Sequence, residues 1–92
     1  MLARAHVWVY GRVHGVFFRA TTRRVAKKIG LTGWVKNVYN PNYVEAVFEG
    51  SRMQIDEMIN FCHKGPPAAI VKNVEVKWED PTGKYDDFDI VF

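Results

Sequence analysis

The hydrophobic pattern of the first half of the chain changes its period from two to about 3.6 and back again. Residues 5–13 alternate between apolar and polar side chains and are rich in β-branched and aromatic types, which predicts a strand that ends at Gly11. Over residues 18–29 the apolar positions lie on one helical face (Phe18, Val25, Ala26 and Ile29) and Gly30 follows, which predicts a helix that ends there. Residues 32–39 and 43–49 are again rich in β-forming residues, and the turn-forming residues between them indicate a hairpin.

The second half of the chain contains the signals of one more helix and two more strands. Ser51 and Gln54 have the spacing of a capping box, which predicts a helix start, and Gly65 followed by two prolines predicts its end. Between these signals the apolar positions recur with the spacing of a buried stripe: Ile55, Met58, Ile59 and Cys62. Residues 69–79 then predict a long strand and residues 88–92 a short final one.

The order of these elements predicts the fold class. A β-α-β-β-α-β sequence with a short terminal strand is typical of an α+β protein of the ferredoxin-like type, an α/β sandwich in which an antiparallel sheet is covered on one face by two helices. With 92 residues, 48% of them hydrophobic, we expect residues 1–92 to form a single domain. This fold serves enzymes, RNA-binding proteins and regulatory modules, so the function has to come from particular residues.

Composition and charge narrow the cellular setting and the type of ligand. The single Cys62 has no partner for an intrachain disulfide, and the chain has neither an apolar leader segment nor an apolar run of membrane-spanning length. We therefore expect a soluble, cytoplasmic protein without a membrane partner. The net charge of +3 hides a split, because residues 1–46 carry a net +7 and residues 47–92 a net −4. The split favours an anionic ligand near the first half, either a phosphate compound or a nucleic acid.

The segment at residues 11–19 (GRVHGVFFR) leads from the first predicted strand through two glycines into the first predicted helix. Glycines let backbone N–H groups converge on one point, and a helix N-terminus adds unpaired N–H groups with a favourable dipole for phosphate. Arg19 adds a guanidinium, which binds a phosphoryl group through paired hydrogen bonds. The segment therefore predicts an anion-binding loop. The alternative is a glycine-containing turn followed by a solvated arginine.

The segment at residues 33–37 (GWVKN) places an asparagine on a strand predicted to lie near the first strand. The Asn37 side chain has both a donor and an acceptor. It is therefore suited to hold a water molecule in line with a bound phosphorus and to donate to an oxyanion. The alternative is an asparagine that only satisfies backbone groups at the end of a strand.

Together, the segments at residues 11–19 and 33–37 closely resemble the two signature segments of the acylphosphatase family. Chain length, element order, Val44 followed by Gly50 and the aromatic-rich end also look like that family, so the resemblance covers essentially the whole chain. It implies the ferredoxin-like fold and an enzyme that hydrolyses a carboxylic-phosphoric mixed anhydride to carboxylate and inorganic phosphate. It also implies that no metal and no organic cofactor takes part.

The resemblance further implies roles for individual residues. Arg19 looks like the essential phosphate-binding arginine, and Asn37 looks like the asparagine that positions the attacking water. The phosphate is expected to lie among the backbone amides of His14, Gly15, Val16, Phe17, Phe18 and Arg19. The expected partners of a monomeric protein are a small acyl phosphate and inorganic phosphate, as product or inhibitor, with no nucleic acid.

Two features depart from the pattern of the acylphosphatase family. His14 stands where the first signature segment usually carries glutamine. We expect a change in loop shape with activity retained, and an imidazole beside bound phosphate would add pH sensitivity near neutrality. The hairpin turn Asn40-Pro41-Asn42 is one residue longer than usual and lacks the usual glycine, which affects the turn more than the position of Asn37.

Two other functions are compatible with the sequence pattern. An RNA-binding module would use the same strand order, the positive charge and exposed aromatic residues such as Trp8 and Tyr10. The basic-glycine-aromatic strand typical of such modules is missing, because residues 43–49 carry two acids instead. A non-catalytic phosphate-binding module would keep the anion-binding loop and lack turnover.

The other residues with possible chemistry are expected to be structural or solvated. Three arginines are expected to be solvated or steering charges: Arg12, Arg23 and Arg24. The positions of His6, Cys62 and His63 match no metal-ligand spacing, and Cys62 lies on the predicted core stripe.

Overall fold

The computed structural model describes all 92 residues and contains five strands and two helices in the predicted order. The strands are β1 (Ala3–Arg12), β2 (Thr32–Val38), β3 (Tyr43–Gly50), β4 (Ile70–Glu79) and β5 (Phe88–Ile90), and the helices are α1 (Phe18–Ile29) and α2 (Arg52–Lys64). The predicted ends of the elements agree with these bounds within two residues, and the bounds of α1 are identical.

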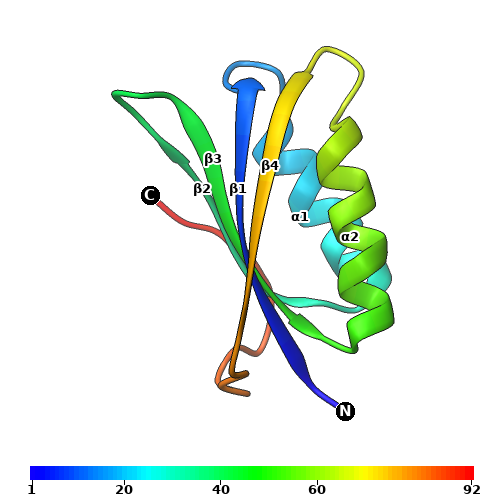
Figure 1. The fold of residues 1–92 in the computed structure, drawn as a ribbon. Coiled ribbons are helices and arrows are strands. Elements are labelled where there is room, and N and C mark those ends of the chain that lie inside the picture. The colour runs from blue at the N-terminus through cyan, green and yellow to red at the C-terminus, as the bar shows by residue number, and fades with distance from the viewer.

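The sheet has the strand order β4-β1-β3-β2-β5. Its four long strands pair antiparallel, as predicted, whereas β5 pairs parallel with β2 through Gly33, Trp34 and Val35. The complete sheet is therefore mixed. β4 ends at the end of the sheet where β2 begins (Figure 1). A chain that crosses there and adds a strand beside β2 has to run in the same direction as β2.

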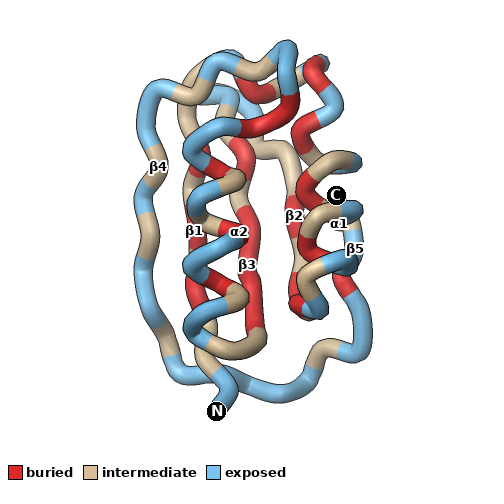
Figure 2. Tube along the Cα trace, turned by 90° about the vertical axis from the view of Figure 1, so that its right-hand side faces the viewer, coloured by how far each residue is buried: buried red, intermediate tan, exposed pale blue.

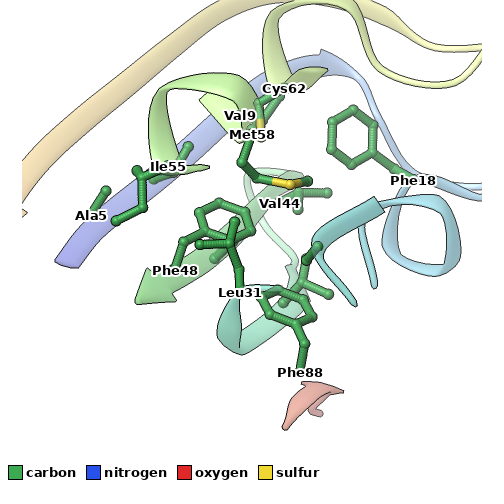
Figure 3. Packing of buried hydrophobic residues seen from close by; sticks show 14 of the residues in the cluster. Ala5, Val9, Phe18, Leu31, Val44, Phe48, Ile55, Met58, Cys62 and Phe88 are labelled. Carbon is green, nitrogen blue, oxygen red and sulfur yellow. The ribbon is translucent and has the colours of Figure 1, made fainter. Parts of the chain in front are cut away.

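Both helices cover one face of the sheet, and the core lies between these two layers (Figures 1 and 2). Sixteen buried hydrophobic residues form one cluster, which includes Phe48 from β3, Met58 from α2 and Phe88 from β5 (Figure 3). The Phe48 and Phe88 rings stack with their centroids 5.4 Å apart. Burying one large apolar side chain contributes about 1.5–3 kcal/mol, so this contact fixes the short last strand against the core.

The two helices differ in how well the hydrophobic pattern predicted their buried faces. The fully buried residues of α2 lie on the predicted stripe: Ile55, Met58 and Cys62. Helix α1 buries a line of residues spaced by four: Phe18, Thr22 and Ala26. Val25 and Ile29, which the pattern placed on the core face, are only partly buried. The pattern missed the middle of the buried line because threonine counts as polar. No helix in the structure combines the length and hydropathy needed to cross a membrane.

The helix ends confirm the signals in the sequence. The Ser51 hydroxyl accepts from the Gln54 N–H at 3.1 Å, and the Gln54 side-chain carbonyl accepts from the Ser51 N–H at 2.9 Å, which completes the predicted capping box. The Gln54 amide also donates to the carbonyl of Ile29 at 3.0 Å, at the last residue of α1. One side chain thereby ties the start of α2 to the end of α1.

One carboxylate is buried on the face of the sheet that the helices leave open. Glu49, on β3, is 1% exposed. Its oxygens accept from the N–H and hydroxyl of Thr82, from the N–H of Gly83 and from Arg4 Nη1 at 3.0 Å. Burial alone would raise the pKa of this carboxyl, but the hydrogen bonds from Thr82, Arg4 and Gly83 hold the pKa below its usual value. This Glu49 cluster (Glu49, Arg4, Thr82 and Gly83) anchors the connection that leads into β5.

Candidate active site

The loop between β1 and α1 presents a set of unpaired backbone donors. Gly15 has a φ of 70° and Phe17 a φ of 62°, and left-handed residues in such a loop are typical of anion-binding nests. A Cβ at Gly15 would meet no atom within 4 Å, so the space beside it is open. Phe17 is the N-cap of α1 and supplies no side-chain cap. The N–H groups of Phe18, Arg19 and Ala20 have no acceptor in the protein.

Apolar side chains hold this loop in place. Val13 and Val16 are buried within the core cluster, and Phe18 packs there with its ring centroid 6.1 Å from that of Phe61 on α2. The residues between these buried side chains, His14, Gly15 and Phe17, are exposed or partly exposed. The buried side chains thus hold the loop against the core and leave its backbone N–H groups free.

A pocket of about 400 Å³ opens beside the loop. Its walls come from the loop, the start of α1, β2, β5 and the segment after β5, and they include Gly15, Arg19, Asn37, Ile90 and Phe92. The two side chains that the sequence singled out therefore lie in one pocket, although one comes from α1 and the other from β2. No acidic residue lines the pocket, and Arg19 is its single charged residue. This combination of charges and donors suits an anionic ligand.

Arg19 brings its positive charge to the pocket without a partner of opposite charge. Its side chain is partly buried, forms no salt bridge and makes no hydrogen bond within the protein. Its Cζ lies 5.6 Å from the centroid of the Phe92 ring, which is a cation–π distance. The five guanidinium N–H groups are therefore available to a ligand.

Asn37 contributes a buried acceptor that no group of the protein satisfies. Its Oδ1 is buried and has no hydrogen-bond partner, whereas its Nδ2 donates to the Tyr39 hydroxyl at 3.4 Å. Asn37 pairs with Val44 of β3 in the hairpin register, so its backbone position is fixed by the sheet. Buried polar atoms are nearly always hydrogen-bonded, and an orphaned acceptor in a pocket indicates a place for a donor such as water.

Comparisons with known proteins identify the family. A family model described as Acylphosphatase matches residues 5–90. The chain belongs to the acylphosphatase family. A protein of Pelotomaculum thermopropionicum named acylphosphatase is 49% identical over 90 residues, covering 98% of this chain and 97% of that protein. The solved acylphosphatase of Bacillus subtilis covers 100% of both chains with a TM-score of 0.92 and 32% identity. The solved acylphosphatase of Coxiella burnetii has a TM-score of 0.92 and 39% identity, covering 98% of this chain and 93% of that chain.

Membership in the acylphosphatase family confirms the fold and the enzyme class predicted from the two signature segments. The relatives carry the name of an enzyme, and they match this chain over nearly its whole length and theirs. The mixed sheet with two helices is the fold of the solved acylphosphatases.

The first departure from the acylphosphatase pattern, His14, lies beside the pocket and faces away from it. Its ring is not part of the pocket wall. Its Nε2 lies 2.8 Å from the carbonyl oxygen of Tyr43, and its ring meets the Tyr39 ring edge to face at 5.0 Å. A carbonyl only accepts, so Nε2 carries the proton in this contact. The imidazole thus points to the hairpin.

The second departure, the longer turn between β2 and β3, leaves the strands in register. Asn40 has a φ of 58°, and the peptide bond to Pro41 is cis. The pairing of β2 with β3 nevertheless runs without a shift from Thr32 opposite Glu49 to Val38 opposite Tyr43. Asn37 therefore keeps its place within the strand, as expected.

Sequence reasoning missed the pocket residues that come from the far end of the chain. Ile90 and Phe92 line the pocket because β5 pairs with β2, and no local signal near residue 90 indicates an anion site. The expectation for Arg23 was wrong. Its Nε donates to the carbonyl of Phe88 at 3.1 Å, so it ties α1 to β5 instead of steering a ligand. Arg12 and Arg24 are exposed, as expected.

Cys62 and His6 take structural positions, and His63 is exposed. Cys62 is fully buried, and burial raises the pKa of its thiol to about 12, which keeps it protonated and unreactive. His6 lies between two carboxylates, with Nε2 2.6 Å from Glu45 and Nδ1 3.4 Å from Glu79. No group of three or more His, Cys, Asp or Glu residues is arranged to hold a metal ion.

Proposed function

We propose that the protein hydrolyses the carboxyl-phosphate anhydride bond of small acyl phosphates in the pocket of Arg19 and Asn37. The observation that carries the proposal is the convergence of three unpaired features in one pocket. These are the free N–H groups at the start of α1, the guanidinium of Arg19 and the buried Oδ1 of Asn37. Each would find its missing partner in a phosphoryl group or in the water that attacks it.

The phosphoryl group would be held by the loop and Arg19. The backbone amides from His14 to Arg19 supply the donors of the loop, and those of Phe18 and Arg19 also lie at the positive end of the dipole of α1. The guanidinium of Arg19 adds paired, charge-assisted hydrogen bonds to the phosphoryl oxygens. These donors stabilise the negative charge that the phosphoryl oxygens carry in the loose transition state typical of phosphoryl transfer.

Asn37 would hold the attacking water. Its Oδ1 accepts one O–H of the water, which leaves a lone pair of the water oxygen free to face the phosphorus. The bond from this oxygen to phosphorus forms as the bond from phosphorus to the acyl oxygen breaks, and the carboxylate leaves with the bonding electron pair. The substrate phosphate takes the proton of the water. No strong base is needed because the carboxylate is a good leaving group.

The acyl group would lie against the apolar part of the pocket. Phe17, Ile90 and Phe92 line the pocket beside Arg19, and the rings of Phe17 and Phe92 are largely exposed to solvent. Contact with a substrate would remove part of this apolar surface from water. The pocket thus has a polar side for phosphate and an apolar side for the group attached to it.

We further propose that the protein works as a monomer in the cytoplasm, with inorganic phosphate as product or inhibitor and without nucleic acid. The open face of the sheet supports the last point. Its Trp8 ring stacks on His6 with centroids 4.1 Å apart, and its Tyr10 hydroxyl donates to Glu75 at 3.2 Å. Aromatic rings that already stack or bind a carboxylate suit base stacking poorly, and acidic groups repel phosphates.

The test is hydrolysis of benzoyl phosphate in the presence of a chelator. We expect turnover by the wild type, a loss of about 10²- to 10³-fold in kcat for Asn37→Ala with inhibition by phosphate retained, and loss of both for Arg19→Ala. Arg24→Ala is the matched control, because it removes an exposed arginine of the same helix outside this pocket. A folded wild type without turnover would contradict the proposal, and phosphate binding in that sample would favour a non-catalytic module.

A further inference from the structure

The first departure from the acylphosphatase pattern, His14, contacts the two residues that flank the second, the turn Asn40-Pro41-Asn42. His14 belongs to the anion-binding loop, and the two residues that it contacts, Tyr39 and Tyr43, stand on either side of the long turn. We propose that His14 and Tyr39 are positioning residues that hold Asn37 at a fixed place relative to the loop. This inference rests on the proposed function, since it assumes that Asn37 carries the attacking water.

His14 makes the direct connection between the loop and the hairpin. Its Nε2–H donates to the Tyr43 carbonyl at 2.8 Å, and no other side chain of residues 13–17 forms a hydrogen bond to the hairpin. Tyr43 is the neighbour of Val44, which pairs with Asn37 across the strands. The bond therefore fixes the loop to the strand segment beside the water-holding residue.

Tyr39 makes a second connection, directly to the Asn37 side chain. One edge contact places its ring against His14 with centroids 5.0 Å apart and planes at 71°. Its hydroxyl accepts from Asn37 Nδ2 at 3.4 Å. With the amide nitrogen engaged in this way, Oδ1 is the atom left for the pocket, where it is buried and unpaired. The three side chains thus form a continuous set of contacts from the loop to the acceptor.

The proposed reaction requires the hairpin and the anion-binding loop to keep a fixed relative position. Phosphate would be held by α1 and its loop, whereas the water would be held by β2, and these parts meet only through tertiary contacts. A misplacement of about 1 Å between reacting groups costs up to about 10²-fold in rate. Phosphate binding needs only the loop and Arg19, so a loosened hairpin would lower kcat and leave phosphate affinity unchanged.

The first experiment compares His14→Leu with His14→Gln in benzoyl phosphate hydrolysis. Leucine loses both contacts of the imidazole, whereas the glutamine amide keeps a donor for the Tyr43 carbonyl. We expect kcat to fall about three- to tenfold in His14→Leu and to recover in His14→Gln, with inhibition by phosphate unchanged in both. Equal kcat in the wild type and His14→Leu, or a parallel loss of phosphate inhibition, would overturn the role of His14.

The second experiment asks whether the effect passes through Asn37. Tyr39→Phe removes the hydroxyl and keeps the ring against His14. We expect His14→Leu and Tyr39→Phe to lower kcat in the wild-type background and to have no further effect in the Asn37→Ala background. Residues that act only on the stability of the fold would lower kcat by the same factor in both backgrounds, which would refute the inference.

A readout without catalysis separates this inference from the proposed function. The side-chain amide of Asn37 gives its own NMR signals in protein labelled with nitrogen-15. We expect lower order parameters for this amide in His14→Leu and Tyr39→Phe than in the wild type, with the backbone of β2 unchanged. If the wild type lacks turnover, the proposed function fails. If the Asn37 amide is equally ordered in all three proteins, the positioning role fails.

Discussion

The Glu49 cluster and the pocket of Arg19 and Asn37 both bring polar groups together, and they differ in whether those groups are satisfied within the protein. Glu49 accepts from three residues, and its charge faces the guanidinium of Arg4. In the pocket, Asn37 Oδ1 has no partner, Arg19 forms no salt bridge, and the first N–H groups of α1 are free. The protein thus contains one complete buried polar network and one pocket whose polar groups lack partners within the protein.

The difference separates stability from binding. A satisfied network repays the cost of removing its groups from water and holds the surrounding chain in one arrangement. A buried polar atom without a partner, such as Asn37 Oδ1, lowers stability until a water molecule or a ligand supplies the missing hydrogen bond. The Glu49 cluster anchors the connection into β5, which carries one wall of the pocket. The Glu49 cluster therefore helps to hold one wall of the pocket in place.

The largest effect on stability is expected when the complete network is broken. Glu49→Ala removes the acceptor of the Thr82 and Gly83 N–H groups and one of the two carboxylates paired with Arg4, and we expect the free energy of unfolding to fall by about 3–5 kcal/mol. Denaturant unfolding measures the change. Asp56→Ala is the control, because it removes an exposed carboxylate paired only with Arg52, and we expect a change below about 0.5 kcal/mol. A similar loss of unfolding free energy in both variants would show that the Glu49 cluster contributes no more than an exposed ion pair.

A smaller effect is expected when a ligand completes the pocket. Inorganic phosphate at about a hundred times its Kd should stabilise the folded protein by about 2.7 kcal/mol, seen as a higher Tm. The shift should disappear in Arg19→Ala and persist in Arg24→Ala, whose arginine lies outside this pocket. A phosphate shift of the same size in Arg19→Ala would mean that phosphate binds elsewhere.

The smallest effect is expected in the acid range. The folded-state pKa of Glu49 lies below its usual value of 4.5, so its stabilisation is present above that pH and is lost as the pH falls through the folded-state pKa. The hydrogen bond from Arg4 also lowers the pKa of Glu79, which acts in the same direction. Denaturant unfolding at several pH values below about 4.5 should show a steeper loss of stability in the wild type than in Glu49→Gln. Parallel curves would show that the Glu49 carboxyl is not held in its charged form by folding.

The charge split along the sequence predicted an anionic ligand but not which basic side chain would be free to contact it. In the structure Arg4 pairs with Glu49 and Glu79, and Lys27 pairs with Asp87, so cations of the first half meet acids of the second. Arg19 keeps its charge unpaired in the pocket. Folding thus pairs some basic residues of the first half with acidic residues of the second. It leaves the Arg19 guanidinium unpaired beside the anion-binding loop, as the segment at residues 11–19 predicted.

Local patterns predicted the elements well, because each depends on neighbouring residues. The capping box of Ser51 and Gln54 and the stripe of α2 are examples, since both follow from spacing within one helical turn or two. Thr22 shows the limit: its burial depends on what α1 packs against, and its residue type indicates the surface. The parallel pairing of β5 is a second limit, because three residues carry no signal for strand direction.

By itself, the sequence determined the order of the elements, since this depends on residue type and local spacing, and its resemblance to the two acylphosphatase signature segments pointed to Arg19 and Asn37 as candidate site residues. Only the tertiary structure decided that Asn37 and Arg19 share one pocket, that Ile90 and Phe92 close it, and that His14 faces the hairpin. The physical reason is strand pairing. Hydrogen bonds between β1, β3, β2 and β5 bring together residues that lie far apart in the chain, and no local pattern specifies which side chains then meet.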